Sequence, residues 1–110
     1  MDKLNINIDN NQEPFFDYTL SVINGKWKLL IIYHLSKNGK VRYNELQRMI
    51  GKITYKTLSS TLKDMQKDGL VHRKEYPQIP PKVEYSLTEK GKSLWPIIEN
   101  MCSWGEQNKY

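Results

Sequence analysis

The sequence predicts a single domain that is mainly α-helical and carries one small β-hairpin, an α+β arrangement. Apolar residues recur with helical spacing over most of the chain. Two short runs rich in β-branched and aromatic residues, 70–76 and 82–87, flank a proline-rich loop, which predicts a hairpin. The 110 residues are enough for one domain with its own core.

The first elements are expected to be two helices. Residues 1–13 are polar and are predicted to form a flexible arm, and residues 14–110 form the domain. Pro14 suits the first turn of a helix over residues 15–23, which ends at Asn24-Gly25. The second helix, over residues 26–36, is apolar nearly all round and is expected to be the central buried helix.

A helix-turn-helix pattern follows a short strand expected at residues 40–43. Asn44 is predicted to cap the third helix, with Gln47 at its third position as in a capping box. Gly51 supplies the turn, and the fourth helix starts at Thr54 and stops at Asp68-Gly69. The inward-facing residues are expected to be Leu46, Met49 and Ile50 on the third helix, and Leu58, Leu62 and Met65 on the fourth.

The last element is expected to be one helix over residues 89–107, capped by Thr88 and kinked at Pro96. The order is then helix, helix, short strand, helix, helix, hairpin, helix. This is the winged helix-turn-helix arrangement with extra N- and C-terminal helices, in which residues 77–81 form the projecting wing.

The positive charge of the chain lies in its middle. Residues 40–82 hold ten Lys or Arg and four acids, a net +6, whereas residues 1–25 carry a net −3 and the whole chain +5. This distribution indicates an acidic partner, most simply nucleic acid. The alternative is that the Lys-rich faces are only solvated.

The fourth helix is the leading candidate for contact with double-stranded DNA. No acid stands in its first turn, and Lys and hydroxyl side chains lie opposite its apolar stripe, which suits the major groove. The candidate residues are Thr54, Tyr55, Lys56, Thr57, Ser60 and Lys63. Tyr55 has an alternative place, packed beneath the turn.

The wing is the second candidate contact. Lys74, Gln78, Ile79 and Lys82 surround its prolines, and a stiff loop loses little entropy on meeting the minor groove or the backbone. Arg42 and Lys26 precede helices and are candidates for phosphate contacts. The alternatives are a plain structural hairpin and two solvated cations.

Seven segments carry a resemblance to a known family: INGKWKLL (23–30), RYNEL (42–46), KTLS (56–59), DGLV (68–71), YPQIPP (76–81), VEYSLT (83–88) and WG (104–105). In order and spacing they resemble the HxlR family of bacterial transcriptional regulators, over about residues 14–106. The resemblance implies a homodimer formed through the terminal helices.

The residues favour the same dimer, because the first and last helices show more apolar surface than one core needs. The candidate interface residues are Phe15, Phe16, Tyr18, Ile97, Met101 and Trp104. A two-fold dimer would place two copies of the fourth helix about 34 Å apart on a palindromic site. The alternative is that apolar residues of these helices close the monomer core, as expected for Leu20, Ile23 and Ile98.

Cys102 is the single cysteine. The resemblance implies a cysteine just before the first helix that senses oxidants or electrophiles, but this chain has Pro14 at that place. Cys102 stands beside Met101 on an apolar helix and is expected to be a buried structural thiol. The alternative is a reactive thiol, which needs exposed, electropositive surroundings that Glu99 and Glu106 oppose.

Other chemistry finds little support in the sequence. His34 and His72 are the only histidines, and the motifs of metal sites, phosphate loops and nucleophilic enzymes are absent, so neither an enzyme nor a cofactor is expected. No membrane span or signal sequence is evident, and the single cysteine favours a cytoplasmic protein.

The sequence therefore predicts a homodimeric, sequence-specific DNA-binding transcriptional regulator, most simply a repressor that occludes a promoter at an inverted repeat. A small-molecule effector of unknown identity between the helices, or none, is favoured over thiol chemistry. The rival interpretation is a winged-helix module that binds a protein partner, because fold does not fix function.

Overall fold

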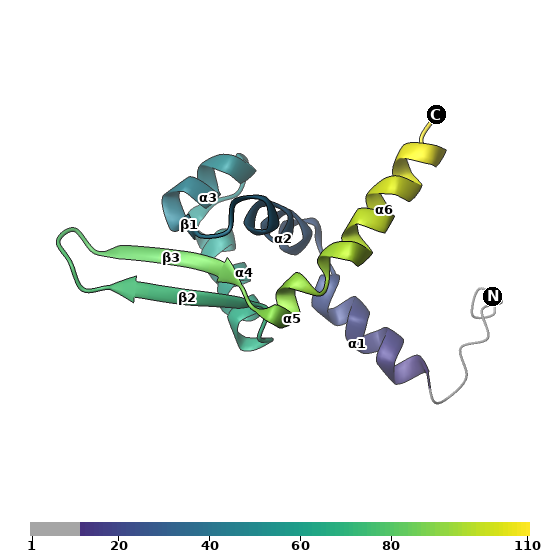
Figure 1. Ribbon diagram of the computed structural model, residues 1–110, viewed down its shortest axis with the longest axis horizontal. Helices are drawn as coiled ribbons and strands as arrows, with labels where there is room; N and C mark the ends of the chain where they lie inside the picture. Colours follow the sequence, from purple (N-terminus) through teal and green to yellow (C-terminus); the bar gives the residue numbers. More distant parts are fainter. Residues whose placement is uncertain (1–11) are drawn as a thin grey trace.

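The computed structural model describes residues 12–110. Its elements are, in order, α1 (Glu13–Ile23), α2 (Lys26–Asn38), β1 (Val41–Arg42), α3 (Tyr43–Ile50), α4 (Tyr55–Lys67), β2 (Val71–Tyr76), β3 (Lys82–Leu87), α5 (Glu89–Lys92) and α6 (Trp95–Asn108). Figure 1 shows a central body of α2 to α5, with the hairpin projecting from one side and α1 and α6 diverging on the other. The mainly helical winged helix-turn-helix prediction is confirmed. Residues 1–11 of the predicted arm lie outside the described part.

The sheet has the order β1-β3-β2, and both pairings are antiparallel. β1 pairs only with the middle of β3, where Val41 lies opposite Tyr85, so the outer part of the hairpin has two strands. This outer part, up to the pairing of Tyr76 with Lys82, extends beyond the body as the wing.

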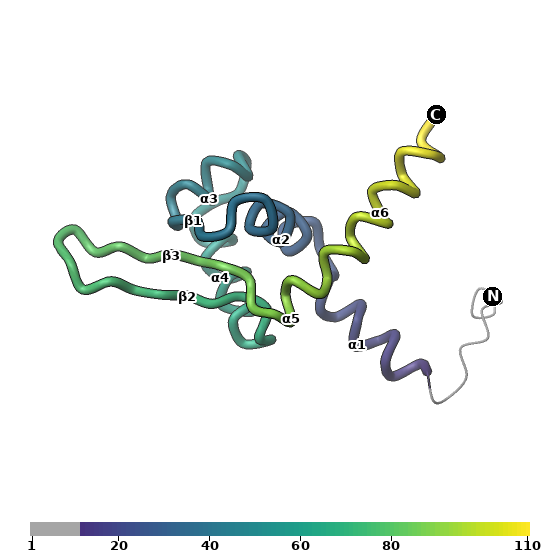
Figure 2. Tube along the Cα trace, in the orientation of Figure 1, coloured from purple at the N-terminus to yellow at the C-terminus, as the bar shows by residue number. Residues whose placement is uncertain are grey.

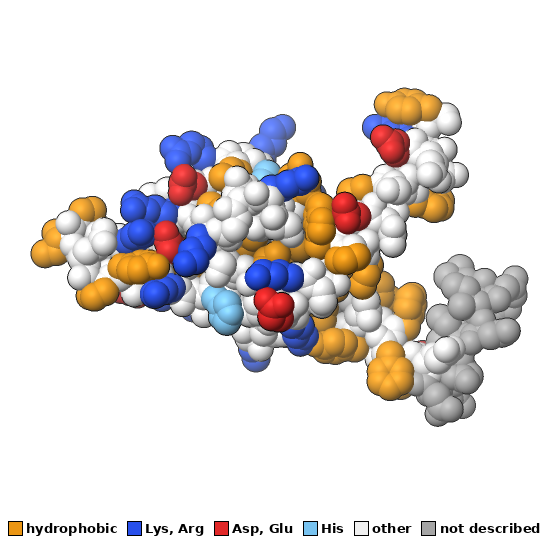
Figure 3. Space-filling view, in the orientation of Figure 1, with side chains coloured by type: hydrophobic (Ala, Val, Ile, Leu, Met, Phe, Trp, Pro, Cys, Tyr) orange, Lys and Arg blue, Asp and Glu red, His pale blue; other side chains and the backbone are white. Residues whose placement is uncertain are grey.

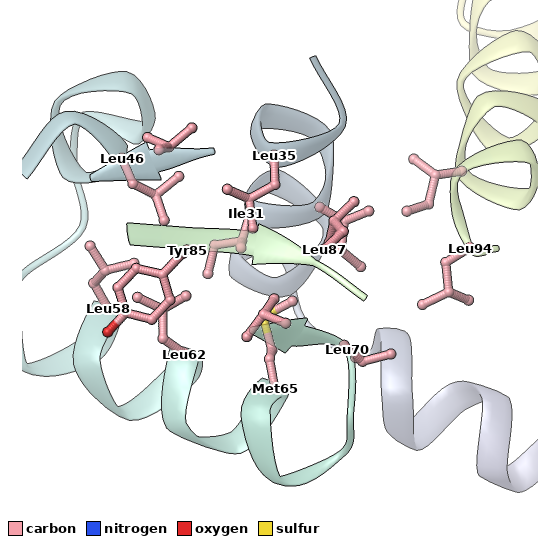
Figure 4. Close-up of a cluster of buried hydrophobic side chains, with 14 of the residues drawn as sticks. Ile31, Leu35, Leu46, Leu58, Leu62, Met65, Leu70, Tyr85, Leu87 and Leu94 are labelled. Carbon is pink, nitrogen blue, oxygen red and sulfur yellow. The ribbon is translucent and has the colours of Figure 1, made fainter. Parts of the chain in front are cut away.

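The core lies where α2, α3 and α4 meet the sheet. Figure 4 shows Leu58, Leu62 and Met65 of α4 pointing toward Ile31 and Leu35 of α2, as the helical spacing predicts. Burial of each such side chain contributes roughly 1.5–3 kcal/mol, so this cluster fixes α4 against the body. Tyr85 and Leu87 of β3 close the cluster from the sheet side.

Several boundaries differ from the sequence prediction, three of them in the first three helices. α1 begins at Glu13, one residue inside the expected arm, and α2 continues to Asn38. α3 begins at Tyr43 with Arg42 as its N-cap, so the predicted cap at Asn44 is wrong. The backbone N–H of Arg42 donates to the Glu45 carboxylate (3.4 Å), which satisfies a helix-end donor and makes an additional cap at Asn44 unnecessary.

The expected single C-terminal helix is two helices. α5 ends at Lys92, and Pro96 stands in the first turn of α6. The predicted kink inside one helix is therefore wrong. Proline lacks an N–H and is tolerated in a first turn, where no intrahelical partner is needed, so the chain begins a new helix there.

α5 joins the turn after α4 through close contacts. The Thr88 hydroxyl donates to the Gly69 carbonyl (2.6 Å), and Lys90 Nζ donates to the Asp68 carbonyl (2.8 Å). Gly91 is buried, and a Cβ built there would overlap the Leu70 carbonyl oxygen. Only glycine therefore lets α5 approach this backbone so closely.

The two ends of the molecule differ in surface character. The trace in Figure 2 shows α1 and α6 leaving the body as separate arms. In Figure 3, Lys and Arg side chains gather over the hairpin half, whereas hydrophobic side chains are prominent on both arms. Leu20 on α1 is 46% exposed, so its expected place in the monomer core is wrong, whereas Ile98 is buried and Ile23 packs against the core.

One inward-facing prediction on α3 also fails. Met49 is 39% exposed, whereas Leu46 is fully buried and Ile50 packs against the core. Met49 lies instead at the surface, where its sulfur accepts a hydrogen bond from the Asn38 side chain at the end of α2 (3.8 Å). No helix in residues 12–110 is long and apolar enough to cross a membrane.

Candidate nucleic-acid interface

The first turn of α4 is built by its N-cap. Thr54 has an extended backbone, and its hydroxyl oxygen accepts a hydrogen bond from the Thr57 backbone N–H (3.1 Å). The same hydroxyl donates to the Thr57 hydroxyl (3.0 Å). The polar groups of Thr54 and Thr57 are therefore engaged in the cap, although both residues were expected to contact DNA.

The outward face of α4 carries the remaining candidates. Lys56, Ser60 and Lys63 are exposed, opposite the buried stripe of the same helix. Tyr55 is 68% exposed and therefore is not packed beneath the turn. No acid lies in the first turn, so the helix N-terminus and Lys56 present positive charge there.

Tyr43 connects the start of α3 to the start of α4. Its hydroxyl donates to the Tyr55 carbonyl (3.0 Å) and shares a hydrogen bond with the Ser59 hydroxyl (2.9 Å). Its ring lies 5.1 Å from the Tyr55 ring and 6.4 Å from the Tyr85 ring, measured between centroids. Burial raises the pKa of Tyr43, so this hydroxyl remains protonated and able to donate at neutral pH. This network orients the leading turn of α4.

An open groove of about 1250 Å³, here called the wing groove, lies between α3, α4 and the hairpin. Its walls are basic and aromatic. The lining residues are Arg42, Tyr43, Asn44, Glu45, Arg48, Tyr55, Ser59, Lys63, Gln66, Arg73, Pro80, Pro81, Lys82, Val83 and Tyr85. The structure thus brings together residues from both predicted contact surfaces.

The hairpin holds its cations around one aromatic ring. Lys74 Nζ lies 5.0 Å and Lys82 Nζ 4.6 Å from the centroid of Tyr76. Tyr76 donates to Glu84 (2.9 Å), and Lys82 pairs with the same carboxylate (3.3 Å). The hydrogen bond from Tyr76 is the main cause that lowers the pKa of Glu84. Gln78 and Ile79 stand at the tip, where Ile79 is fully exposed.

Lys26 does not join this group. It is the first residue of α2, just after α1, and its Nζ lies 4.6 Å from the Trp27 ring centroid. The wing groove is instead lined from Arg42 onward. Lys26 is therefore not among the candidates that the wing groove brings together.

Several groove residues were not singled out from the sequence. Arg48 shares one polar face of α3 with Asn44 and Glu45, a spacing that helical periodicity reveals. Arg73 alternates with Lys74 along β2 and lies opposite Tyr85 in the sheet. A hydrogen bond with the Tyr85 hydroxyl is the main cause that raises the pKa of Arg73. The strand alternation was a usable signal, but only the fold shows that both arginines line one groove.

The predicted interface residues all lie on the two arms and are exposed. Phe15 is 73% and Trp104 68% exposed, and Phe16, Tyr18, Ile97 and Met101 are also exposed. Cys102 is a free, exposed thiol on α6. The expected burial of this cysteine is wrong, because α6 leaves the body and packs against the core near its start, through Trp95 and Ile98.

Acidic, His and Cys side chains do not gather into a metal-binding group within residues 12–110. The groove has the charge and hydroxyl donors of a nucleic-acid surface instead. Its chemistry is binding, with Lys and Arg for phosphates and hydroxyl or amide groups for base edges.

Comparison with known proteins is decisive for the family. The model of the HxlR-like helix-turn-helix family matches residues 22–110. The chain belongs to this family. An HTH-type transcriptional regulator, BH0655 of Halalkalibacterium halodurans, is 59% identical over 102 residues, which cover 93% of this chain and 90% of the relative. The regulator YdzF of Bacillus subtilis is 53% identical over 94 residues, covering 86% and 85%.

Solved structures agree with the fold. The redox regulator HypR in its reduced form matches with a TM-score of 0.80 and 49% identity, over 86% of this chain and 92% of that one. The reduced form of YodB from B. subtilis matches with a TM-score of 0.77 and 34% identity, over 86% and 92%. This HxlR-family protein is therefore a DNA-binding transcriptional regulator.

Proposed function

We propose that this HxlR-family protein acts as a homodimeric repressor that binds an inverted-repeat operator and occludes a promoter. The supporting observation is that α4 presents an exposed basic and hydroxyl face while the two arms leave apolar side chains uncovered. A two-fold dimer through α1 and α6 would present two α4 helices to successive major grooves, about 34 Å apart. Such a regulator works in the cytoplasm, the compartment that holds the DNA of its bacterial relatives.

The site assignments divide by surface. Lys56 and Ser60 read base edges from the outer face of α4, and Lys74, Gln78, Ile79 and Lys82 bring the hairpin to the neighbouring groove or backbone. On the arms, Phe15 and Trp104 are the anchors of the dimer. Large aromatic side chains contribute most at protein interfaces when a partner covers them.

Selection from a randomised duplex pool, followed by anisotropy on the enriched site, tests the proposal. The expected result is an inverted repeat with half-sites about one turn apart, bound at least ~10³-fold more tightly than random duplex. Weak binding without an enriched motif would refute operator recognition and favour a protein partner. Lys56→Ala and Ser60→Ala should weaken operator binding without changing the dimer, and equal loss of both would show that this face was assigned wrongly.

A thiol-responsive regulator is the second candidate, favoured by the exposure of Cys102 and by similarity to the redox regulator HypR. Oxidation of Cys102 on α6 would alter an arm of the dimer and so the separation of the two α4 helices. In this case an oxidant releases DNA from the unaltered protein but not from Cys102→Ser. Equal release from both proteins would end this candidate.

A further inference from the structure

We propose that the wing groove seats the sugar-phosphate backbone of one DNA strand, with Arg48 and Arg73 as its principal phosphate contacts. Electrostatic affinity then resides in the groove, and base selectivity resides on the outer face of α4. This inference rests on the proposed function, because it specifies how the same DNA is held. It also assigns Lys63 to the backbone rather than to a base.

The groove has a strong excess of positive charge. Its lining includes five cations, Arg42, Arg48, Lys63, Arg73 and Lys82, against one carboxylate, Glu45, a net +4. That carboxylate accepts the Arg42 backbone N–H. A concave surface of one sign raises the local concentration of an oppositely charged ligand. The groove therefore fits a polyanion along its length.

The cations that matter most are available. Within residues 12–110, Arg48 and Lys63 form no salt bridge, and the one salt bridge of Arg73 is with Glu75, at 3.2 Å between Nη1 and Oε1, beside its hydrogen bond with the Tyr85 hydroxyl. The side chains of Arg73 and Glu75 are 39% and 57% exposed. An exposed pair of this kind contributes little, so a phosphate can replace the carboxylate. The planar guanidinium group matches phosphate oxygens in a two-pronged contact.

α4 offers two surfaces at once. Tyr55, Ser59, Lys63 and Gln66 recur at helical spacing and line the groove, without an acid among them. Ser60 lies one residue further round, on the outer face, and is not part of the lining. One helix can therefore touch a backbone on its flank while its outer face meets the base edges.

The position of the groove identifies its occupant. Figure 1 shows the hairpin extending past α4 and away from the body. With α4 in the major groove, the hairpin would therefore reach toward the next groove. Neighbouring grooves of a duplex are separated by one sugar-phosphate backbone. A protein that engages both must seat that backbone between α4 and the hairpin, which is where the wing groove lies.

The test is the salt dependence of binding to a random-sequence duplex, by fluorescence anisotropy. Each neutralised phosphate contributes about 0.9 to the slope of log K against log salt, so Arg48→Gln and Arg73→Gln should each reduce the slope by about 1, and the double variant by about 2. Lys63→Gln should behave likewise. The matched control is Lys92→Gln on α5, an exposed cation outside the groove, which should leave the slope unchanged.

The preference for matched over mismatched sites distinguishes the flank of α4 that lines the groove from its outer face. On the enriched operator, the arginine variants should lose affinity for matched and mismatched sites by the same factor. Ser60→Ala should keep the salt slope and change the preference. Circular dichroism confirms that each variant is folded.

An unchanged slope in the folded double variant would overturn the proposal, and so would a loss confined to the operator, which would make the arginines base readers. The random duplex keeps this test separate from the proposed function. Absence of an enriched motif would refute operator recognition while the slope still reports on the groove.

Discussion

The two halves of this molecule differ in how well they bury their apolar side chains. The DNA-binding half, from α2 to β3, buries its apolar side chains and leaves cations outside. The α1 and α6 arms bury only Val22 and Ile98 well and leave large apolar side chains uncovered. The first half is stable by its own packing, whereas the second would be completed by a partner copy in the proposed dimer.

The largest expected effect lies in the DNA-binding half. Leu62→Ala removes a fully buried side chain and should lower the free energy of unfolding by about 2–5 kcal/mol. Leu20→Ala on α1, where the side chain is 46% exposed, should cost less than about 1 kcal/mol at protein concentrations that keep the chain monomeric. Chemical denaturation measures both, and equal costs would erase the contrast between the halves.

The next effect belongs to the arms. Trp104→Glu should weaken the dimer by about 100-fold or more, because it removes an aromatic anchor and adds a charge that the interface would bury. Ser103→Glu adds the same charge beside it on α6, away from the apolar face, and serves as the control. Sedimentation velocity distinguishes monomer from dimer. A Trp104→Glu protein that remains dimeric would refute the interface.

The contact between α5 and the turn after α4 should be sensitive to a single added methyl group at Gly91. Gly91→Ala places a methyl group against the Leu70 carbonyl and 3.1 Å from a methyl carbon of Leu87. We expect a loss of about 1–3 kcal/mol, since α5 must move off the turn that follows α4. Gly105→Ala on α6 meets nothing within 4 Å and should stabilise the monomer by about 0.5–1 kcal/mol. Thermal unfolding that ranks the two variants in the opposite order would contradict the described packing.

Within the DNA-binding half, Tyr43→Phe should distinguish the role of Tyr43 in orienting α4 from its role in stability. The variant keeps the ring contacts but loses the hydrogen bonds to the Tyr55 carbonyl and the Ser59 hydroxyl. The free energy of unfolding should fall by about 1 kcal/mol. Operator affinity should fall several-fold more than affinity for random duplex. Tyr33→Phe, an exposed ring on α2, is the control. Equal loss for both duplexes would limit Tyr43 to a structural role.

The smallest effect concerns pH. The pKa of Glu84 is lowered in the folded protein, chiefly by the hydrogen bond from Tyr76, so its contribution to stability is present above its ordinary pKa and is lost as pH falls through the lowered value. Tyr76→Phe should raise the pKa of Glu84 toward its ordinary value. An NMR titration of the Glu84 carboxyl carbon measures this, and an unmoved midpoint would exclude Tyr76 as the cause.

The α4 stripe of Leu58, Leu62 and Met65, the hairpin strands and the element order as far as the hairpin followed from the sequence, because periods of 3.6 and 2 and a proline-rich loop are local signals. The exposed face of α4 followed from the same period. The ends of the helices followed less closely from the sequence. Arg42 rather than Asn44 caps α3, because the choice depends on which backbone donor Glu45 reaches.

Other features depended on contacts between segments distant in the chain. Pro96 starts a new helix instead of kinking one, since α5 ends at Lys92 and Pro96 stands in the first turn of α6, and Cys102 is exposed because α6 leaves the body. Arg48 and Arg73 are 25 positions apart in the sequence and come together only when the sheet folds beside α3. Local periodicity therefore determined the helices, the hairpin and the outer face of α4, whereas tertiary packing decided which cations share a groove and which apolar faces remain uncovered.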